Sequence, residues 1–327
     1  MQTNLAAEDY IHGGLQKTFY AESDVEACPC PLCNERVDST PIYQERGNLG
    51  IVRCNRCDLI YVNPRAKGSS ENYHGDPDVY FEEARLIFSG KKEHHRDRNY
   101  EWEIREIQKL KPSGKLLDIG TNMGFFLRKV VAAGFQAEGV EPSPSLSKIA
   151  RENFNLKITN SYFEAAGFAP HSFDVITMID VFEHVTNPLE LLGSAHQVLA
   201  DDGVLCIKVP NGNYNLLKQH LAKRMKREGQ YDIWDSYEHV VHYTPETMDK
   251  MAKKAGFRVE KLLLPIPVHS PVWAAVVGHY YQYASPFWMD WKRITLRNLF
   301  YAAGRVEKAL AKSPHCAPDL MFMLRKA

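Results

Sequence analysis

The run Lys115-Leu-Leu-Asp118-Ile-Gly120-Thr-Asn122-Met-Gly124 decides the fold. Its apolar first half predicts a strand, its two glycines predict a turn, and helical spacing of apolar residues starts at Phe125. A strand, a glycine-containing loop and a helix in this order are the first part of a βαβ unit. Glycines at that turn let the backbone approach a ligand closely, so we expect this loop to bind one.

The alternation of strand and helix continues on the C-terminal side of this run. Short apolar or β-branched runs predict strands at 115–120, 136–140, 156–159, 173–180, 203–209, 257–264 and 319–324. Helical patterns predict helices at 125–133, 143–153 and 187–200, and one that opens with Thr244 as N-cap and ends before Gly256. This order predicts an α/β fold with a doubly wound, mostly parallel seven-stranded sheet and a ligand beyond the carboxyl ends of its strands.

Composition excludes several classes of protein. The 327 residues suggest about two domains. Lys plus Arg (40) equals Asp plus Glu (40), so no overall basic field favours nucleic acid as a partner. No stretch reaches the roughly 18 uninterrupted apolar residues of a membrane span. The N-terminus lacks the basic and apolar regions of a secretory signal, and we therefore expect a cytoplasmic protein.

The cysteines predict a metal site. Two C-x-x-C pairs, separated by residues 34–53, supply Cys30, Cys33, Cys54 and Cys57. Such pairs are typical of a structural, tetrahedral zinc ion in a reducing compartment. Asn34 and Asp58 follow the pairs, and both residue types tolerate the positive φ at the end of a zinc knuckle. Cys28 competes with Cys30, but only Cys30 has the spacing to Cys33. Free cysteines or a redox dithiol are the alternatives.

Composition and motifs divide the chain further. We predict an N-terminal tail at 1–25, a zinc-binding module like a zinc ribbon at 26–66, a helical cap or linker at 67–111, and a ligand-binding domain at 112–327 with helical inserts at 211–240 and 265–316. The basic stretch 216–227 is either a solvated helix face or a clamp on a diphosphate. The aromatic-rich insert is packed helix, a lid over substrate, the contact of a homodimer, or a contact with a membrane surface. His94 and His95 lie in a charged run and are expected to be exposed.

Two carboxylates indicate the chemistry of the ligand. Glu141 ends the second strand, where a carboxylate accepts hydrogen bonds from ribose hydroxyls. Asp118, two positions before Gly120, would repel the pyrophosphate of a dinucleotide, and the G-x-G-x-x-G spacing is missing. A cationic ligand, such as the sulfonium and ammonium of S-adenosylmethionine (SAM), fits an acidic strand end better.

Together with Gly139–Pro142 and Ser172–Val175, the loop resembles the class I SAM-dependent methyltransferases, which have a Rossmann-like sheet. The cysteine pairs and Asn122 narrow the resemblance to the zinc-containing sugar C-methyltransferases of deoxysugar pathways and their polysaccharide-cluster relatives. The resemblance implies SAM as cofactor, structural Zn²⁺, and transfer of a methyl group to a small molecule, a sugar or nucleotide-linked sugar. It also implies three sets of contacts with SAM. The methionine half would be bound by Asp118, Gly120, Asn122 and Gly124, and the ribose by Glu141. The adenine would be bordered by Pro142, Ser161 and Tyr162.

Two clusters could supply a base. Glu238-His239 resembles a Glu-His pair of the sugar C-methyltransferases, in which His239 would match a general base. Asp180, Glu183 and His184 resemble the Glu-x-x-Glu-His of ubiquinone-pathway O-methyltransferases, where such a cluster can hold a divalent metal. For this second cluster a metal, a catalytic or substrate role for His184, and a structural role with Asp180 touching SAM all remain open. The alternative functions are therefore O-methylation of a phenolic or lipid-like metabolite, or a scaffold without activity.

Overall fold

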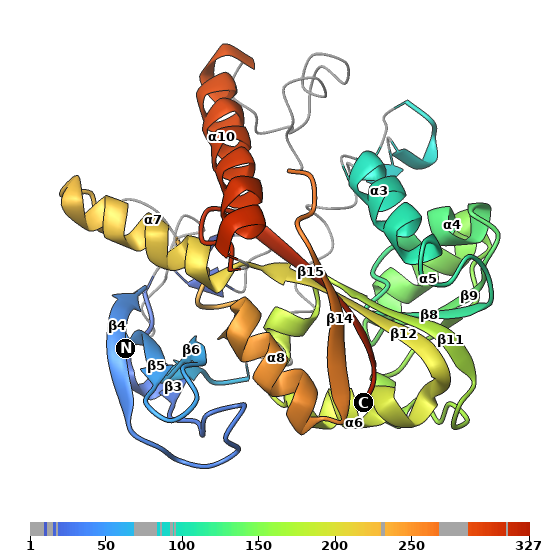
Figure 1. The fold of residues 1–327 in the computed structure, drawn as a ribbon, viewed down its shortest axis with the longest axis horizontal. Helices are drawn as coiled ribbons and strands as arrows, with labels where there is room; N and C mark the ends of the chain where they lie inside the picture. The colour runs from blue at the N-terminus through green and yellow to red at the C-terminus, as the bar shows by residue number, and fades with distance from the viewer. Residues whose placement is uncertain are drawn as a thin grey trace, which may run out of the picture.

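The computed structural model describes residues 10–11, 16–17, 19–68, 84–85, 87–91, 94, 96–229, 233–267, 287–311 and 313–327. Its main body is a seven-stranded sheet of order β10-β9-β8-β11-β12-β15-β14 (Figure 1). In chain order the strands are β8 (Lys115–Ile119), β9 (Gln136–Val140), β10 (Ile158–Thr159), β11 (Phe173–Ile179), β12 (Leu199–Pro210), β14 (Phe257–Leu263) and β15 (Asp319–Lys326). Only β15 runs antiparallel to its neighbours, which confirms the predicted mostly parallel sheet.

Helices cover both faces of this sheet. They are α3 (Asp97–Gln108), α4 (Phe125–Ala132), α5 (Pro144–Phe154), α6 (Pro188–Val198) and α8 (Pro245–Lys254). Successive strand residues point to opposite faces. Accordingly, Leu116 packs in a buried cluster with residues of α3, α4 and α5, whereas Leu117 packs in a second cluster with residues of α6 and α8. The sheet is therefore doubly wound, as predicted.

The helix that opens at Thr244 begins as its sequence indicates. The Thr244 side chain accepts the backbone N–H of Thr247, Pro245 occupies the first turn, and Glu246 adds an acid there. The chain leaves the helix through Gly256 with φ of 80°. Local chemistry alone was sufficient to predict this element.

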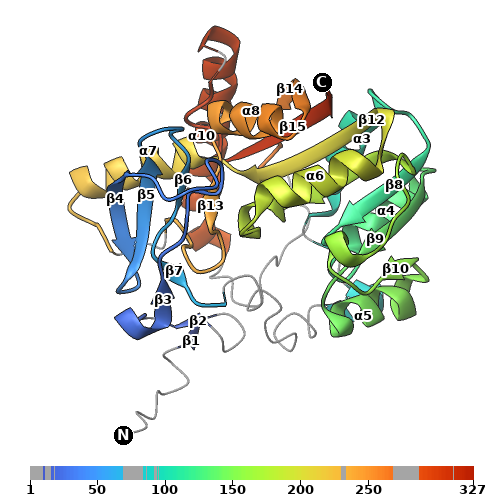
Figure 2. The ribbon, with the colours of Figure 1, turned by 90° about the horizontal axis from the view of Figure 1, so that it is seen from below.

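The N-terminal module contains a second, antiparallel sheet of order β13-β6-β5-β4. Its own strands are β4 (Ser39–Glu45), β5 (Leu49–Cys54) and β6 (Ile60–Val62), and a short pair joins β3 (Val25–Glu26) to β7 (Arg65–Ala66). The fourth strand, β13 (Val241–His242), comes from the other end of the chain and pairs with β6 (Figure 2). The module is thus joined to the main body by backbone pairing.

His94, in the cap, differs from its predicted exposure. His94 is buried, stacked on Phe125 at 4.4 Å and on Tyr100 at 5.4 Å between ring centroids, so the expectation that it is exposed was wrong. An imidazole ring buries its apolar body against aromatic rings, which outweighs its charged neighbours in sequence. His95 and residues 268–286 of the aromatic insert lie outside the described residues.

The described parts of the inserts are helical. The first insert contains α7 (Gly212–Arg224), whose basic C-terminal end is exposed, and the second contains α10 (Phe287–Ala311), which projects from the main body in Figure 1. The domain boundaries themselves stay a prediction. Within the described residues, no helix combines the length and the apolar character needed to cross a bilayer.

Candidate functional site

The loop after β8 turns sharply over the carboxyl end of the sheet. Gly120, Asn122 and Gly124 have φ values of 71°, 51° and 82°, which is the left-handed region that favours glycine and asparagine. A Cβ added at Gly120 would lie 2.6 Å from the Cγ2 of Val181, and one at Gly124 would lie 2.5 Å from the Cδ1 of Leu156. The loop therefore requires its glycines both for conformation and for space, and its Gly120 lies directly beside the segment that follows β11.

Glu141 connects the end of β9 to this loop. Its buried carboxylate accepts the backbone N–H of Asn122 and that of Ser143, each at 2.9 Å. Burial raises the pKa of this carboxyl. Each oxygen of a carboxylate accepts more than one hydrogen bond, so both retain capacity for a diol. Glu141 therefore faces the loop, and its predicted contact with a ribose stays a prediction.

Asp118 lies in β8 with its carboxylate buried beneath the loop. It accepts hydrogen bonds from the hydroxyls of Thr121 and Thr177, the latter at 2.6 Å. Burial raises the pKa of this carboxyl to about 7. Among the described residues no Lys or Arg side chain forms an ion pair with Asp118, and a buried carboxylate without a cationic partner is costly.

The edge beyond Glu141 is the predicted adenine border. Tyr162 is half exposed, and Ser161 beside it in the chain and Pro142 after β9 are partly buried. Asn160, which the sequence analysis did not select, donates its side-chain amide to the carbonyls of Glu141 (2.8 Å) and Pro142 (2.9 Å). An asparagine amide that bridges two strand ends has no distinctive sequence pattern, because its partners are set by the tertiary fold.

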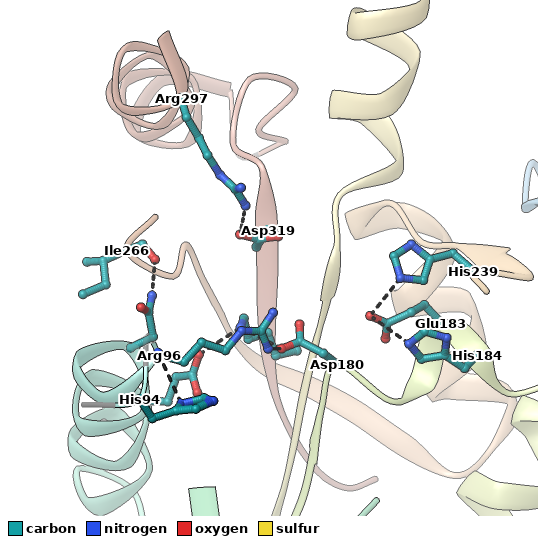
Figure 3. A network of polar contacts seen from close by, with 12 residues as sticks. His94, Arg96, Asp180, Glu183, His184, His239, Ile266, Arg297 and Asp319 are labelled. Atoms are coloured by element: carbon teal, nitrogen blue, oxygen red, sulfur yellow. Dashed lines mark hydrogen bonds and ion pairs between the residues drawn. The ribbon is translucent and has the colours of Figure 1, made fainter. Parts of the chain in front are cut away.

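Asp180 follows β11 and lies in a network of charges at the same end of the sheet (Figure 3). Its Oδ2 accepts from Arg96 and from the buried Lys208, the latter at 3.1 Å, and these cations hold the pKa of Asp180 below its ordinary range. Lys208 also lies 3.2 Å from the buried carboxylate of Glu103 on α3. Buried charges need such partners. The network joins the cap to the sheet and occupies Asp180, which the sequence analysis assigned to SAM or to a metal cluster.

Glu183, His184 and His239 form a compact group beside this network (Figure 3). The Nε2 atoms of His184 and His239 each lie 4.0 Å from Oε1 of the buried Glu183. Within the described part of the chain, Oε2 of Glu183 has no hydrogen-bond partner. Burial raises the pKa of Glu183 and lowers that of His184 to about 3.

Main-chain contacts orient the ring of His184 and fix the backbone of His239. His184 Nδ1 lies 2.8 Å from the carbonyl oxygen of Glu238, so Nε2 is the nitrogen directed toward Glu183. The backbone N–H of His239 donates to the carbonyl of Asp235 at 2.8 Å, and Oδ2 of Asp235 lies 3.9 Å from His239 Nε2. Two of the three predicted catalytic residues, His184 and His239, thus lie together with Glu183, whereas Glu238 reaches the group only through its backbone carbonyl. Asp235 was missed because no motif distinguished it.

The four predicted cysteine ligands converge. The Sγ atoms of Cys30 and Cys57 lie 3.5 Å apart, those of Cys33 and Cys54 lie 3.7 Å apart, and all four fall within 4.8 Å of one another. A tetrahedral ion with bonds of about 2.3 Å places sulfurs about 3.8 Å apart, so the cluster fits zinc. Cys28 instead donates its thiol to the carbonyl of Val62 at 3.3 Å.

The backbone around this cluster also fits two metal-binding turns. Asn34 and Asp58 have φ of 59° and 67°, as predicted. Lys250 and Lys254 of α8 donate to the carbonyls of Cys57 (2.9 Å) and Leu32 (2.8 Å), so the main body holds both turns from outside.

Comparison with known proteins places this geometry in context. Residues 93–262 match a family model described as a methyltransferase domain. The chain is similar to the ubiquinone biosynthesis O-methyltransferase of Psychrobacter arcticus, with 27% identity over 163 residues, covering 46% of this chain and 61% of the relative. The protein of the same name from Cereibacter sphaeroides is 26% identical over 152 residues, covering 43% and 59%. The chain therefore spans about three fifths of the length of these curated relatives.

Solved structures give a weaker likeness. A SAM-dependent methyltransferase from Archaeoglobus fulgidus shares 18% identity, covers 74% of this chain and 99% of its own, and has a TM-score of 0.46. The matched family region covers more than half of the chain. It contains the β8 loop, Glu141 and both histidine segments, whereas the four cysteines lie outside it.

Proposed function

The chain belongs to the methyltransferase-domain family. We propose that it is a SAM-dependent methyltransferase whose acceptor is a sugar or nucleotide-linked sugar, methylated at carbon or oxygen. The observation that carries this proposal is the proximity of the two halves of the site. Val181, which touches the position of Gly120 in the donor loop, stands two residues before Glu183 in the group with His184 and His239. Donor and acceptor residues therefore share one edge of the sheet.

On the donor side, the proposal assigns a role to each predicted contact. The backbone turn of Gly120, Asn122 and Gly124 would contact the methionine half, with Asp118 beneath the turn as the counter-charge. Glu141, already oriented by two backbone N–H groups, has lone pairs for the ribose hydroxyls. Tyr162, with Pro142 and Ser161, borders the adenine. The donor loop is thus preorganised around a cationic, ribose-containing molecule.

On the acceptor side, His239 removes the proton. Bound SAM supplies an electrophilic methyl group, and alignment with the acceptor contributes on the order of 7–11 kcal/mol. The acceptor's proton passes to Nε2 of His239, and the side chain of Asp235, whose Oδ2 lies 3.9 Å away, stabilises the positive charge that forms there. His184, held by the Glu238 carbonyl, fixes the other side of Glu183.

A second candidate function is metal-assisted O-methylation of a phenolic or lipid-like acceptor. It is favoured by the same three residues, whose ligand atoms lie within 4.8 Å of one another and could hold a divalent cation. The unpartnered Oε2 of the buried Glu183 adds to this support. In this version His239 takes the place that the sequence analysis gave to Asp180, because Asp180 is bound by Arg96 and Lys208.

One assay distinguishes the two functions. The enzyme is incubated with methyl-tritiated SAM and either a nucleoside-diphosphate keto-deoxysugar or a catechol, each with and without EDTA, and zinc retention is checked. The favoured proposal expects label in the sugar nucleotide irrespective of EDTA. Label only in the catechol, lost with EDTA while the cysteine-bound zinc remains, would replace it by the second function.

The pKa of Asp118 predicts how SAM affinity depends on pH. With a pKa near 7, Asp118 is neutral at lower pH and negatively charged at higher pH. A cationic ligand binds the charged form, so affinity should rise about tenfold between pH 6 and pH 8. Isothermal titration measures this. Asp118→Asn should bind weakly with no such dependence, whereas a wild-type affinity that stays constant over this range would contradict the role of Asp118.

We also propose that the cysteine cluster holds structural Zn²⁺. Four thiolates close the coordination shell and leave no position for substrate. Thiolate ligands persist in reducing compartments, which supports a cytoplasmic location.

A further proposal is that two copies of the chain associate through α10. Exposed apolar side chains repeat along it at alternating steps of three and four residues, at Leu296, Leu299, Ala303, Val306 and Leu310. This spacing forms one continuous apolar stripe on a helix. It is the pattern by which the same helix of two copies packs together.

Charge placed in that stripe should therefore separate the copies. Val306→Glu is expected to convert a dimer to a monomer in light scattering coupled to size-exclusion chromatography, because the carboxylate would be buried in the contact. Arg305→Ala, outside the stripe, is the matched control and should stay dimeric. A monomeric wild-type protein would refute the contact.

A further inference from the structure

Glu45 is the last residue of β4. Its carboxylate forms hydrogen bonds with the segment of the chain that precedes His239. Its buried carboxylate accepts three backbone N–H groups from the main body. Oε1 accepts from Ile233 (3.2 Å) and Trp234 (3.0 Å), and Oε2 accepts from Ser236 (3.2 Å). Hydrogen bonds to an ionised acceptor are stronger than neutral ones, and three on one carboxylate define the path of the chain closely.

The same segment continues directly into the acceptor site. The carbonyl of Asp235 accepts the N–H groups of Glu238 (3.0 Å) and His239 (2.8 Å), which closes a turn immediately after the residues held by Glu45. The turn places His239 Nε2 opposite Glu183. A shift of residues 233–236 would therefore move the imidazole.

The module also holds the chain beyond His239. Val62 donates its N–H to the carbonyl of Val240 at 3.0 Å, and β13 then pairs with β6. Contacts with the module thus flank His239 in sequence, with Glu45 ahead of it and β6 behind it.

Apolar packing also holds the segment around Trp234 against the N-terminal module. Trp234 is fully buried in one cluster with Leu49 and Ile51 of the module. Its ring meets His242 edge-on at 4.9 Å between centroids, and Tyr237 stacks on Tyr20 at 5.7 Å. The segment is consequently part of the core of the module rather than a loop resting on its surface.

We propose that Glu45 is a positioning residue for His239, and that the zinc-binding module serves the enzyme by holding the acceptor-side segment 233–242 in place. The module makes these contacts on the acceptor side, while the residues assigned to the donor lie in the β8 loop and at the end of β9. The catalytic consequence rests on the proposed function, whereas the structural consequence can be measured without any acceptor.

The test compares Glu45→Gln with the wild-type enzyme by amide hydrogen exchange. Glutamine keeps the size of the side chain but replaces one acceptor oxygen by a donor, which then faces a backbone N–H and leaves it unsatisfied. Exchange at residues 233–239 should become about 10–100-fold faster. SAM affinity should stay within about twofold and zinc content unchanged. With the nucleoside-diphosphate keto-deoxysugar as probe, kcat should fall about tenfold or more while the KM for SAM is retained.

Two further variants make the result decisive. Glu45→Asp keeps the negative charge but moves the carboxylate away from the three N–H groups, because the side chain is shorter. It should give an exchange rate between those of the wild type and Glu45→Gln. It replaces the glutamine variant in the test if that variant does not fold. Glu26→Gln, an exposed glutamate of the same module paired with Arg65 at 3.0 Å, should leave exchange and turnover unchanged.

The outcomes separate this inference from the proposed function. Unchanged protection of residues 233–239, or a loss of SAM affinity as large as the loss of kcat, would overturn the role of Glu45. Faster exchange in Glu45→Gln, with no transfer to the sugar probe even by the wild-type enzyme, would support the role of Glu45 and refute the proposed acceptor instead.

Discussion

Turnover of the His239→Ala enzyme is expected to be about 10²–10⁴-fold lower than that of the wild type, with the affinity for SAM within about twofold. The imidazole Nε2 lies 4.0 Å from Glu183 and 3.9 Å from Asp235, so the substitution removes the proposed base from its position between these two side chains. Steady-state transfer from tritiated SAM gives the rate, and titration calorimetry gives the affinity. The matched control is His171→Ala, an exposed histidine paired with Asp201 at 3.0 Å, which should keep full activity.

Three other results would change the assignment of His239. Unchanged turnover would remove it from the mechanism. An equal loss of SAM affinity would move it to the donor side. Recovery of activity on adding a divalent cation would favour the metal-assisted alternative, because a site with two remaining ligands binds a cation more weakly than one with three.

Loss of the metal is expected to have the largest effect on stability. Cys54→Ser should reduce zinc from about one equivalent to less than half, because one of four thiolates is lost. Zinc binding contributes about 10–16 kcal/mol to the folding of small zinc peptides, so the module should unfold well below the melting temperature of the wild type. Elemental analysis and scanning calorimetry measure both effects.

The control for this experiment lies in the same module. Cys28→Ser keeps a donor for the carbonyl of Val62 and leaves the four sulfurs in place, so it should retain zinc. Loss of zinc from the Cys28 variant, or full retention by the Cys54 variant, would show that the ligands were misassigned.

The main sheet and the convergence of the four cysteines could be predicted because the information for them is local. The run from Lys115 to Gly124 contains a strand, a turn and a helix start within ten residues, and each cysteine pair defines its own turn. The capping of α8 by Thr244 is of the same kind. Each of these features depends on neighbours in sequence, whose spacing the backbone geometry fixes.

The unpredicted features depend on partners that are distant in sequence. Asp180 was grouped with Glu183 and His184 by helical spacing, but Arg96 and Lys208 draw its carboxylate into a separate network. β13 has two residues, too few for a period-two pattern to register. Glu45 looks like any strand-end acid until the segment from Ile233 is placed against it.

Because β6 of the N-terminal module pairs with β13, the module cannot be separated from the main body without breaking a sheet. A fragment ending at residue 68 would present β6 as a bare edge, with the amides and carbonyls that Val241 and His242 cover left open to other chains. A chimaera in which the N-terminal module is replaced by that of another enzyme would also have to replace residues 233–242. The structural unit that contains the cysteine cluster is therefore discontinuous along the chain, because it includes residues of β13.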